Sequence, residues 1–105
     1  LLPMPFKTPI KSFENTVIKF RGFDKNDKDN YEEIVKLLGG KFDSDNVTHL
    51  IISEKNYINY EKIKSELEKN HYNNVKIIAL DWMLECCLNG CRVDEELYLV
   101  EKRNK

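Results

Sequence analysis

The sequence predicts an α/β domain in which a mainly parallel, four-stranded sheet is flanked by three helices. Short apolar runs typical of buried strands alternate along the chain with segments whose apolar residues recur at helical spacing. The strongest signal runs over residues 75–88, where a strand-like run with two adjacent isoleucines passes directly into a helix that is apolar on almost every side. Such a helix must be buried, so we expect the rest of the chain to cover it.

The chain is long enough for one domain, because 105 residues with 41% hydrophobic side chains can bury one modest core. All three prolines lie within residues 1–12, which we interpret as an extended lead-in or linker. We predict the domain itself over residues 13–100 and a solvated tail over residues 101–105. Since the chain starts at Leu1 rather than at methionine, we expect it to be a piece of a longer protein.

The first strand is predicted over residues 17–23 and ends near Gly22, after which the polar residues 24–30 are expected to form a loop. Asn30 is a good helix N-cap, so the first helix should begin directly after it. The apolar residues of this helix recur at positions i, i+3, i+4 and i+7, which places them on one face: Tyr31, Ile34, Val35 and Leu38.

Two glycines are expected to end this helix. Gly39 suits the left-handed residue that commonly follows a helix, and Gly40 lets the backbone turn tightly into a short second strand near residues 41–43. The apolar residues 47–52 predict a third strand, in which His49 is expected to make a structural hydrogen bond. The polar residues 53–59 are expected to form a loop.

The second helix is predicted over residues 60–70, where a thin apolar stripe of Ile63 and Leu67 among many charges indicates a surface position. The fourth strand begins at residue 75, and Asp81 is expected to cap the third helix. This helix carries the chain's only tryptophan, Trp82, as a core residue, and Gly90 is expected to end it. The last apolar contacts are predicted for Val93, Leu97, Tyr98 and Val100.

Composition excludes several classes of function. The net charge of −1 and the pI of about 6.2 lack the basic excess of a nucleic-acid clamp, so direct nucleic-acid binding is not expected. No run of 18 apolar residues is present, and we therefore expect no membrane span. An odd number of cysteines in or beside one helix makes no disulfide framework and favours a reducing compartment, the cytosol or the nucleus: Cys86, Cys87 and Cys91. These cysteines lack a fourth ligand nearby, so neither a metal nor another cofactor is expected.

Four motifs follow one another at compatible spacing: Gly39-Gly40 after the amphipathic helix, the Val-Thr-His-Leu-Ile strand at residues 47–51, Asp81-Trp82 at the start of the last helix, and the closing residues 87–98. In this order they resemble a BRCT domain, and the resemblance covers residues 13–100. It implies a four-stranded parallel sheet in the order 2-1-3-4, with the first and third helices on one face and the second helix on the other. Gly39, Gly40 and Trp82 would be structural core positions.

The resemblance also implies a function. BRCT domains are non-catalytic interaction modules, found mostly in nuclear DNA-damage, replication and checkpoint scaffold proteins. Many bind phosphorylated peptides, often as tandem pairs. We therefore expect a protein or phosphopeptide partner, a neighbouring BRCT repeat in the parent chain, and a location in the nucleus.

A phosphate site is predicted where the strand order reverses, because open parallel sheets bind ligands at the carboxyl ends of such strands. Arg21 and Gly22 follow the first strand, and Ser53 follows the third. Lys62 stands in the first turn of the second helix, whose free N–H groups favour an anion, and it matches the pocket lysine of the family. Arg21 departs from the family pattern, because phosphate-binding members usually carry Ser or Thr before the glycine.

Two other interpretations stay open. The domain could be a purely structural repeat that packs against a neighbouring BRCT repeat or dimerises. A small α/β enzyme is the rival of another class, because Cys86 and Arg92 match the Cys-x5-Arg pattern of cysteine phosphatases. That chemistry needs the thiolate on a loop whose free N–H groups cradle the phosphate. Cys86 is predicted inside a helix instead, so we do not expect an enzyme.

Overall fold

The computed structural model describes residues 13–42, 46–72 and 74–103. The lead-in expected at residues 1–12 and the last two residues of the expected tail therefore lie outside the described residues. Three parallel strands form one sheet in chain order: β1 (Ile18–Arg21), β2 (His49–Ile52) and β3 (Lys76–Ala79). In register, Phe20 of β1 lies beside Ile51 of β2, which lies beside Ile78 of β3.

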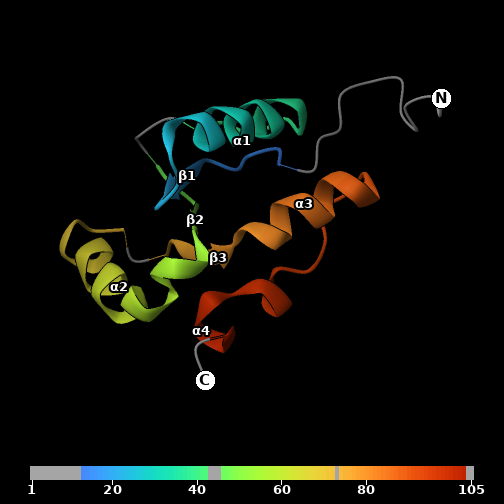
Figure 1. Cartoon of the computed structure of the whole chain (residues 1–105). Helices are drawn as coiled ribbons and strands as arrows, with labels where there is room; N and C mark the ends of the chain where they lie inside the picture. Colours follow the sequence, from blue (N-terminus) through green and yellow to red (C-terminus); the bar gives the residue numbers. More distant parts are fainter. Residues whose placement is uncertain (1–12, 43–45, 73, 104–105) are drawn as a thin grey trace.

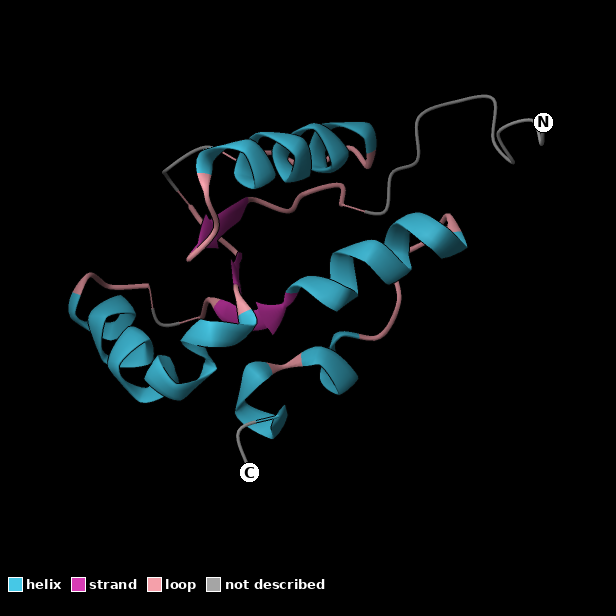
Figure 2. Cartoon of the chain, viewed as in Figure 1, coloured by secondary structure: helices cyan, strands magenta, loops and turns pink. Residues whose placement is uncertain are grey.

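Helices connect the strands and follow the last one (Figure 1, Figure 2). The α-helices within the described residues are α1 (Lys25–Leu37), α2 (Tyr60–Lys69), α3 (Leu80–Asn89) and the short α4 (Val100–Arg103). Two 3-10 helices lie between them: η1 (Glu54–Asn59), which leads into α2, and η2 (Glu95–Tyr98), which precedes α4.

The helices cover both faces of the sheet, with α1 and α3 on one face and α2 and α4 on the other (Figure 1). Alternation along the strands divides the core accordingly, because successive side chains point to opposite faces. Ile51 and Ile78 face α1 and α3, where they meet Trp82, Met83 and Val35. The second core layer is formed against α2 and α4 by Leu50, Ile52, Ile77, Tyr60, Ile63 and Val100.

The prediction of four strands is wrong for the described residues, in which three strands form. Of the second strand predicted near residues 41–43, Lys41 forms one parallel bridge with Val17, Phe42 forms no strand, and Asp43 lies outside the described residues. Ile18 N–H donates to the Lys41 carbonyl at 2.7 Å, so this residue does lie beside β1 in the position expected of the second strand. The sequence continues Phe-Asp-Ser-Asp-Asn, and Asp, Ser and Asn favour turns over strands.

The first helix begins six residues earlier than predicted, at Lys25 instead of Tyr31. Asp24 is the N-cap, and its side chain accepts from the Asp27 N–H at 2.9 Å, so the expected loop over residues 24–30 and the expected cap at Asn30 are both wrong. The early turns face solvent and need no apolar residue, which explains why the apolar pattern starts late. Gly39 does take the left-handed conformation after this helix, with φ 85°.

Gly40 is required for a different reason. A Cβ atom at this position would lie 2.9 Å from Phe13 Cβ and 2.9 Å from Val35 Cγ1, which is closer than side chains pack. The glycine therefore lets the backbone pass close to Phe13 and Val35 as the chain leaves α1.

Three further boundaries differ from the prediction. Residues 54–59 form η1 rather than a loop, and α3 begins at Leu80 with Ala79 as N-cap, so Asp81 lies in the first turn and is not the cap. Apolar contacts were predicted for Leu97 and Val100. The Leu97 side chain is 73% exposed and does not belong to the core, whereas Val100 is fully buried. The expected tail begins as the exposed end of α4.

Candidate functional site

The predicted phosphate site lies at the carboxyl ends of β1 and β2. Arg21 is the last residue of β1, and its carbonyl accepts from the Ser53 N–H at 3.0 Å. Gly22 follows in the left-handed region with φ 88°. A Cβ atom on Gly22 would lie 2.4 Å from Ser53 Oγ and 2.0 Å from Asn56 Nδ2. Only glycine permits this approach, so the backbone of the β1–α1 loop is in direct contact with the start of η1.

Ser53 places a hydroxyl group beside Gly22. Its Oγ accepts from Asn56 Nδ2 at 2.7 Å, and among the described residues its own hydrogen is donated to no acceptor. A phosphate oxygen at this point could therefore accept from the hydroxyl without breaking the contact with Asn56. Phosphate-binding members of the BRCT family usually carry a hydroxyl group on the residue before the glycine. Here that residue is Arg21, and Ser53, which follows the neighbouring strand β2, carries a hydroxyl group instead.

Arg21 is engaged by α2. Its Nη1 lies 2.9 Å from Glu66 Oε2, and both side chains are nearly half exposed. Exposed ion pairs of this kind contribute roughly 0–1 kcal/mol, so the contact can be exchanged for a better acceptor. The prediction did not anticipate Glu66, which accepts from the guanidinium group.

Lys62 is exposed on the first turn of α2. It precedes Glu66 by four residues and so shares its helix face, which is the face that meets Arg21. Within the described residues its ammonium group makes no hydrogen bond or ion pair. The structure thus brings Arg21, Gly22 and Ser53 together and places Lys62 one helical turn from the Arg21–Glu66 contact. Their role in phosphate binding stays a prediction.

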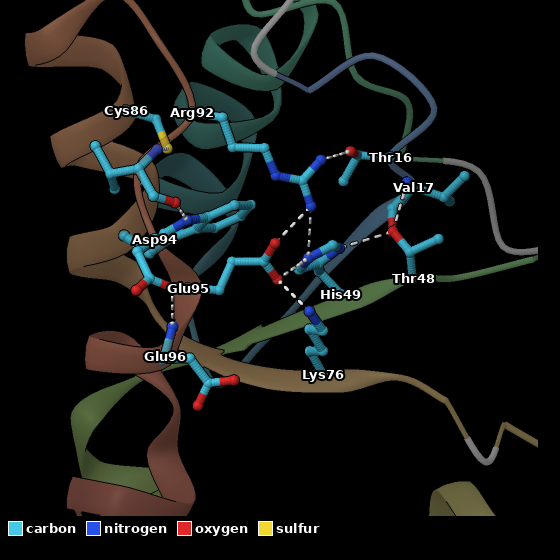
Figure 3. Close-up of polar contacts among 12 residues, drawn as sticks. Thr16, Val17, Thr48, His49, Lys76, Cys86, Arg92, Asp94, Glu95 and Glu96 are labelled. Atoms are coloured by element: carbon cyan, nitrogen blue, oxygen red, sulfur yellow. Dashed lines mark hydrogen bonds and ion pairs between the residues drawn. The ribbon is translucent and has the colours of Figure 1, made fainter.

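A second polar cluster, which the sequence reasoning missed, lies at the opposite ends of the strands and is centred on Glu95 (Figure 3). Glu95 Oε2 is 2.7 Å from His49 Nε2 and 3.1 Å from Lys76 Nζ, and Glu95 Oε1 is 2.6 Å from Arg92 Nη2. The His49 side chain is almost fully buried, and that of Glu95 is 13% exposed. The spacing Arg92-x-x-Glu95 was the available signal, but a pair three residues apart is common on protein surfaces.

The hydrogen bonds assign the His49 tautomer. A carboxylate only accepts, so Nε2 carries the hydrogen that is donated to Glu95, and Nδ1 lies 2.8 Å from the Thr48 hydroxyl oxygen. Burial lowers the pKa of His49 and outweighs the opposing effect of Glu95, so the ring is neutral at pH 7. Burial alone would raise the pKa of Glu95, but hydrogen bonds from Arg92, His49 and Lys76 dominate and lower it to about 2. This cluster joins β2, β3 and η2.

Cys86 lies inside α3, where it is fully buried, and its sulfur accepts from the Val93 N–H at 3.4 Å. Burial raises the pKa of this thiol, and the Val93 hydrogen bond offsets that only in part. The position therefore lacks the features that activate the cysteine of a phosphatase loop.

We expect Cys86 to react slowly with a thiol reagent at neutral pH, because its thiolate is disfavoured and its sulfur is covered. Cys87 and Cys91 are exposed in the same protein and serve as internal controls. Peptide-level mass spectrometry after brief labelling should find the reagent on these two cysteines first. Rapid labelling of Cys86 with turnover of an aryl phosphate would revive the phosphatase interpretation.

A parallel sheet covered by helices on both faces, with polar side chains gathered at the carboxyl ends of two neighbouring strands, defines a small α/β domain. Comparison then gives the particular family: residues 9–87 match the BRCA1 C Terminus (BRCT) domain. The chain belongs to the BRCT family. BRCT domains are generally protein–protein interaction modules of DNA-repair and cell-cycle proteins and are typically non-catalytic.

Individual proteins agree with this assignment. Human protein ECT2 is 28% identical over 102 residues, which cover 94% of this chain and 10% of ECT2, so the chain spans about a tenth of the length of that relative. The first BRCT domain of the DNA-repair protein XRCC1 superposes with a TM-score of 0.66 at 22% identity, covering 85% of this chain and 66% of that one. The BRCT domain of the human DNA repair protein REV1 superposes with a TM-score of 0.61 at 19% sequence identity. The match covers 86% of this chain and 88% of that one. None of the helices in the described residues is long and apolar enough to cross a membrane.

Proposed function

We propose that this domain binds a phosphorylated segment of a partner protein at the carboxyl ends of β1 and β2. The observation that carries the proposal is the Ser53 hydroxyl, which lies beside Gly22 with its hydrogen unused among the described residues. It can supply the hydroxyl that phosphate-binding family members carry before the glycine, where this chain has Arg21. The phosphate would accept from the Ser53 hydroxyl and the Gly22 N–H, and Lys62 would supply a positive charge from α2.

Arg21 would take part in phosphate binding by exchanging the Glu66 carboxylate for the phosphate. A guanidinium group binds phosphate through two parallel N–H groups, which is a stronger contact than an exposed pair with one carboxylate oxygen. Release from Glu66 would turn Arg21 toward the phosphate, and it would also leave the Glu66 carboxylate near the anion. Glu66 therefore weakens binding in this proposal.

Lys62→Ala should weaken phosphopeptide binding by roughly 1.5–3 kcal/mol, the usual value of a hydrogen bond to a charged group. Stability should hardly change, because the side chain is exposed. Lys69→Ala is the matched control, since it removes an exposed lysine from the last turn of the same helix. Calorimetry with one phosphopeptide and its unphosphorylated twin measures both variants.

Two variants at the Arg21–Glu66 pair extend this experiment. Glu66→Gln should strengthen phosphopeptide binding, because it frees Arg21 and removes a nearby negative charge. Arg21→Ser should weaken binding if arginine contacts the phosphate and strengthen it if arginine covers the site. Equal affinity of wild type for the phosphorylated and unphosphorylated peptides, unchanged in every variant, would remove the phosphate site.

The proposal includes a setting in the cell. DNA repair is named for both XRCC1 and REV1, whose BRCT domains share this fold. We therefore place the parent protein in the nucleus, as a scaffold of DNA-damage, replication or checkpoint pathways. Co-localisation of the tagged parent protein with damaged chromatin tests this, and exclusion from the nucleus under all conditions would contradict it.

Packing against another domain is the second candidate function. Leu84 and Leu88 lie four residues apart on α3, and both are exposed, Leu88 by 80%. An exposed apolar stripe on one helix face favours contact with a neighbouring repeat or with a second copy. Sedimentation of the isolated domain distinguishes a monomer from a dimer, and the phosphopeptide titration is independent of the result.

A further inference from the structure

A cavity lies directly beside the proposed phosphate site. It has a volume of about 330 Å³, and Ser53 is shared between the two. Phe23 from the β1–α1 loop and Leu80 from the start of α3 form apolar parts of its wall, and Tyr57 from η1 adds a second aromatic ring. The volume is at the lower end of the roughly 300–1,000 Å³ found for ligand pockets. A single side chain of a bound peptide is therefore a suitable occupant.

The charge of this cavity is opposite to that of the phosphate site. Two carboxylates line it, Glu54 in the first turn of η1 and Asp81 in the first turn of α3, and both residues are exposed. Among the described residues that line it there is no lysine or arginine. Arg21, at the end of β1, and Lys62, on α2, are not among the residues that line it. The basic residues near Gly22 thus favour a phosphate, and the carboxylates of the cavity favour a cation.

We propose that this cavity binds a lysine or arginine side chain of the partner, within a few residues of the phosphorylated one. This inference rests on the proposed function, and it names the sequence class of the phosphopeptide. The aliphatic stem would lie on Leu80 and Phe23, and the cation would meet Glu54, Asp81 and the Tyr57 ring. A carboxylate offers several acceptor positions, so Asp81 can accept from the ligand in addition to its contacts within the domain.

A peptide array tests the preference in wild-type protein. Its members carry a central phosphoserine or phosphothreonine, and each position within about three residues on either side is varied in turn. At one position, lysine and arginine should bind about fivefold more tightly than glutamine, the upper end for a partly exposed ion pair. Leucine should give no such gain there, and glutamate should be the weakest. The preference should shrink as salt is raised, because exposed charges are screened.

Glu54→Gln links this preference to the cavity. The variant should reduce the gain from lysine to about twofold, while its affinity for the glutamine peptide stays close to that of wild type. Asp81→Asn is a second variant, and the Glu54→Gln/Asp81→Asn double variant should abolish the preference. Glu32→Gln is the matched control, because it removes a carboxylate of α1 that lies outside the cavity. Thermal melting checks that each variant is folded.

The outcomes separate this inference from the proposed function. Binding that ignores the phosphate would overturn the proposed function, and the inference would fall with it. Phosphate-dependent binding without a preference for a basic residue would overturn the inference alone. A preference for leucine at the same position, or a basic preference that is equal in Glu54→Gln, Asp81→Asn and Glu32→Gln, would do the same.

Discussion

Trp82→Ala should destabilise the domain by roughly 3–5 kcal/mol, which is a large share of a typical total stability of about 5–15 kcal/mol. The indole ring is fully buried and is stacked between Phe13, at 4.8 Å, and His49, at 5.0 Å, measured between ring centroids. Its Nε1–H donates to the Val93 carbonyl at 3.0 Å. Alanine would leave a cavity between two aromatic rings and an unsatisfied carbonyl group, so both costs are incurred at once.

Urea unfolding followed by far-UV circular dichroism measures this loss, since the mutation removes the chain's only tryptophan and with it the fluorescence signal. Leu88→Ala is the matched control, because it shortens an apolar side chain of the same helix that is 80% exposed. Its stability should lie within about 0.5 kcal/mol of wild type. If Trp82→Ala unfolded at the same urea concentration as Leu88→Ala, the packing around the indole would not stabilise the fold as described.

Most of the fold could be predicted because the core residues repeat at strand or helix spacing. Ile51, Ile78 and Val35 all lie in segments whose pattern indicated burial, and all three are fully buried. The start of α1 could not be predicted in this way. Asp24 and Asn30 are both good N-caps, and the exposed turns between them carry no apolar pattern that would choose the first. The predicted second strand spanned only about three residues, too few for a periodic pattern to support it, and among its described residues only Lys41 forms a bridge.

The meeting of Gly22 and Ser53 could be predicted from a general rule, because parallel strands present their carboxyl ends at one edge of the sheet. The partners that modify the site could not. Arg21 meets Glu66 across 45 residues of sequence, and that contact depends on how α2 packs on the sheet. Local sequence holds no information on such a pairing. The same applies to His49, whose structural hydrogen bond was expected but whose partner Glu95 lies 46 residues away.

Glu95→Gln should destabilise the domain by roughly 2–3 kcal/mol at pH 7, because it removes the anion that three cationic or polar groups share. Breaking a fully buried pair costs about 3–5 kcal/mol. The value here is smaller, since Arg92 and Lys76 remain partly exposed and can be hydrated. Glu96→Gln is the matched control, because the adjacent carboxylate is largely exposed and pairs with Lys102 on the surface. That variant should change stability by less than about 1 kcal/mol.

The effect of Glu95 should also depend on pH. Its pKa is about 2 in the fold against an ordinary value of 4.5, so the folded state holds the proton less tightly than the unfolded chain does. The stabilisation is therefore complete above about pH 4.5 and is lost as the pH falls toward 2. His49 acts in the same direction from about pH 6.5 downward, because burial lowers its pKa and the unfolded chain binds its proton first.

Urea unfolding of wild type and Glu95→Gln at a series of pH values follows the carboxylate below about pH 4.5, since glutamine does not titrate. The difference in unfolding free energy should decrease between about pH 4.5 and 2, as the Glu95 carboxylate of wild type takes up its proton. Glu96→Gln should show only a small difference at pH 7, because its carboxylate is exposed. If the difference in unfolding free energy between wild type and Glu95→Gln stayed constant from pH 7 to about pH 2, the side chain would contribute through its shape alone. The hydrogen bonds from Arg92 and His49 would then not stabilise the ionised carboxylate.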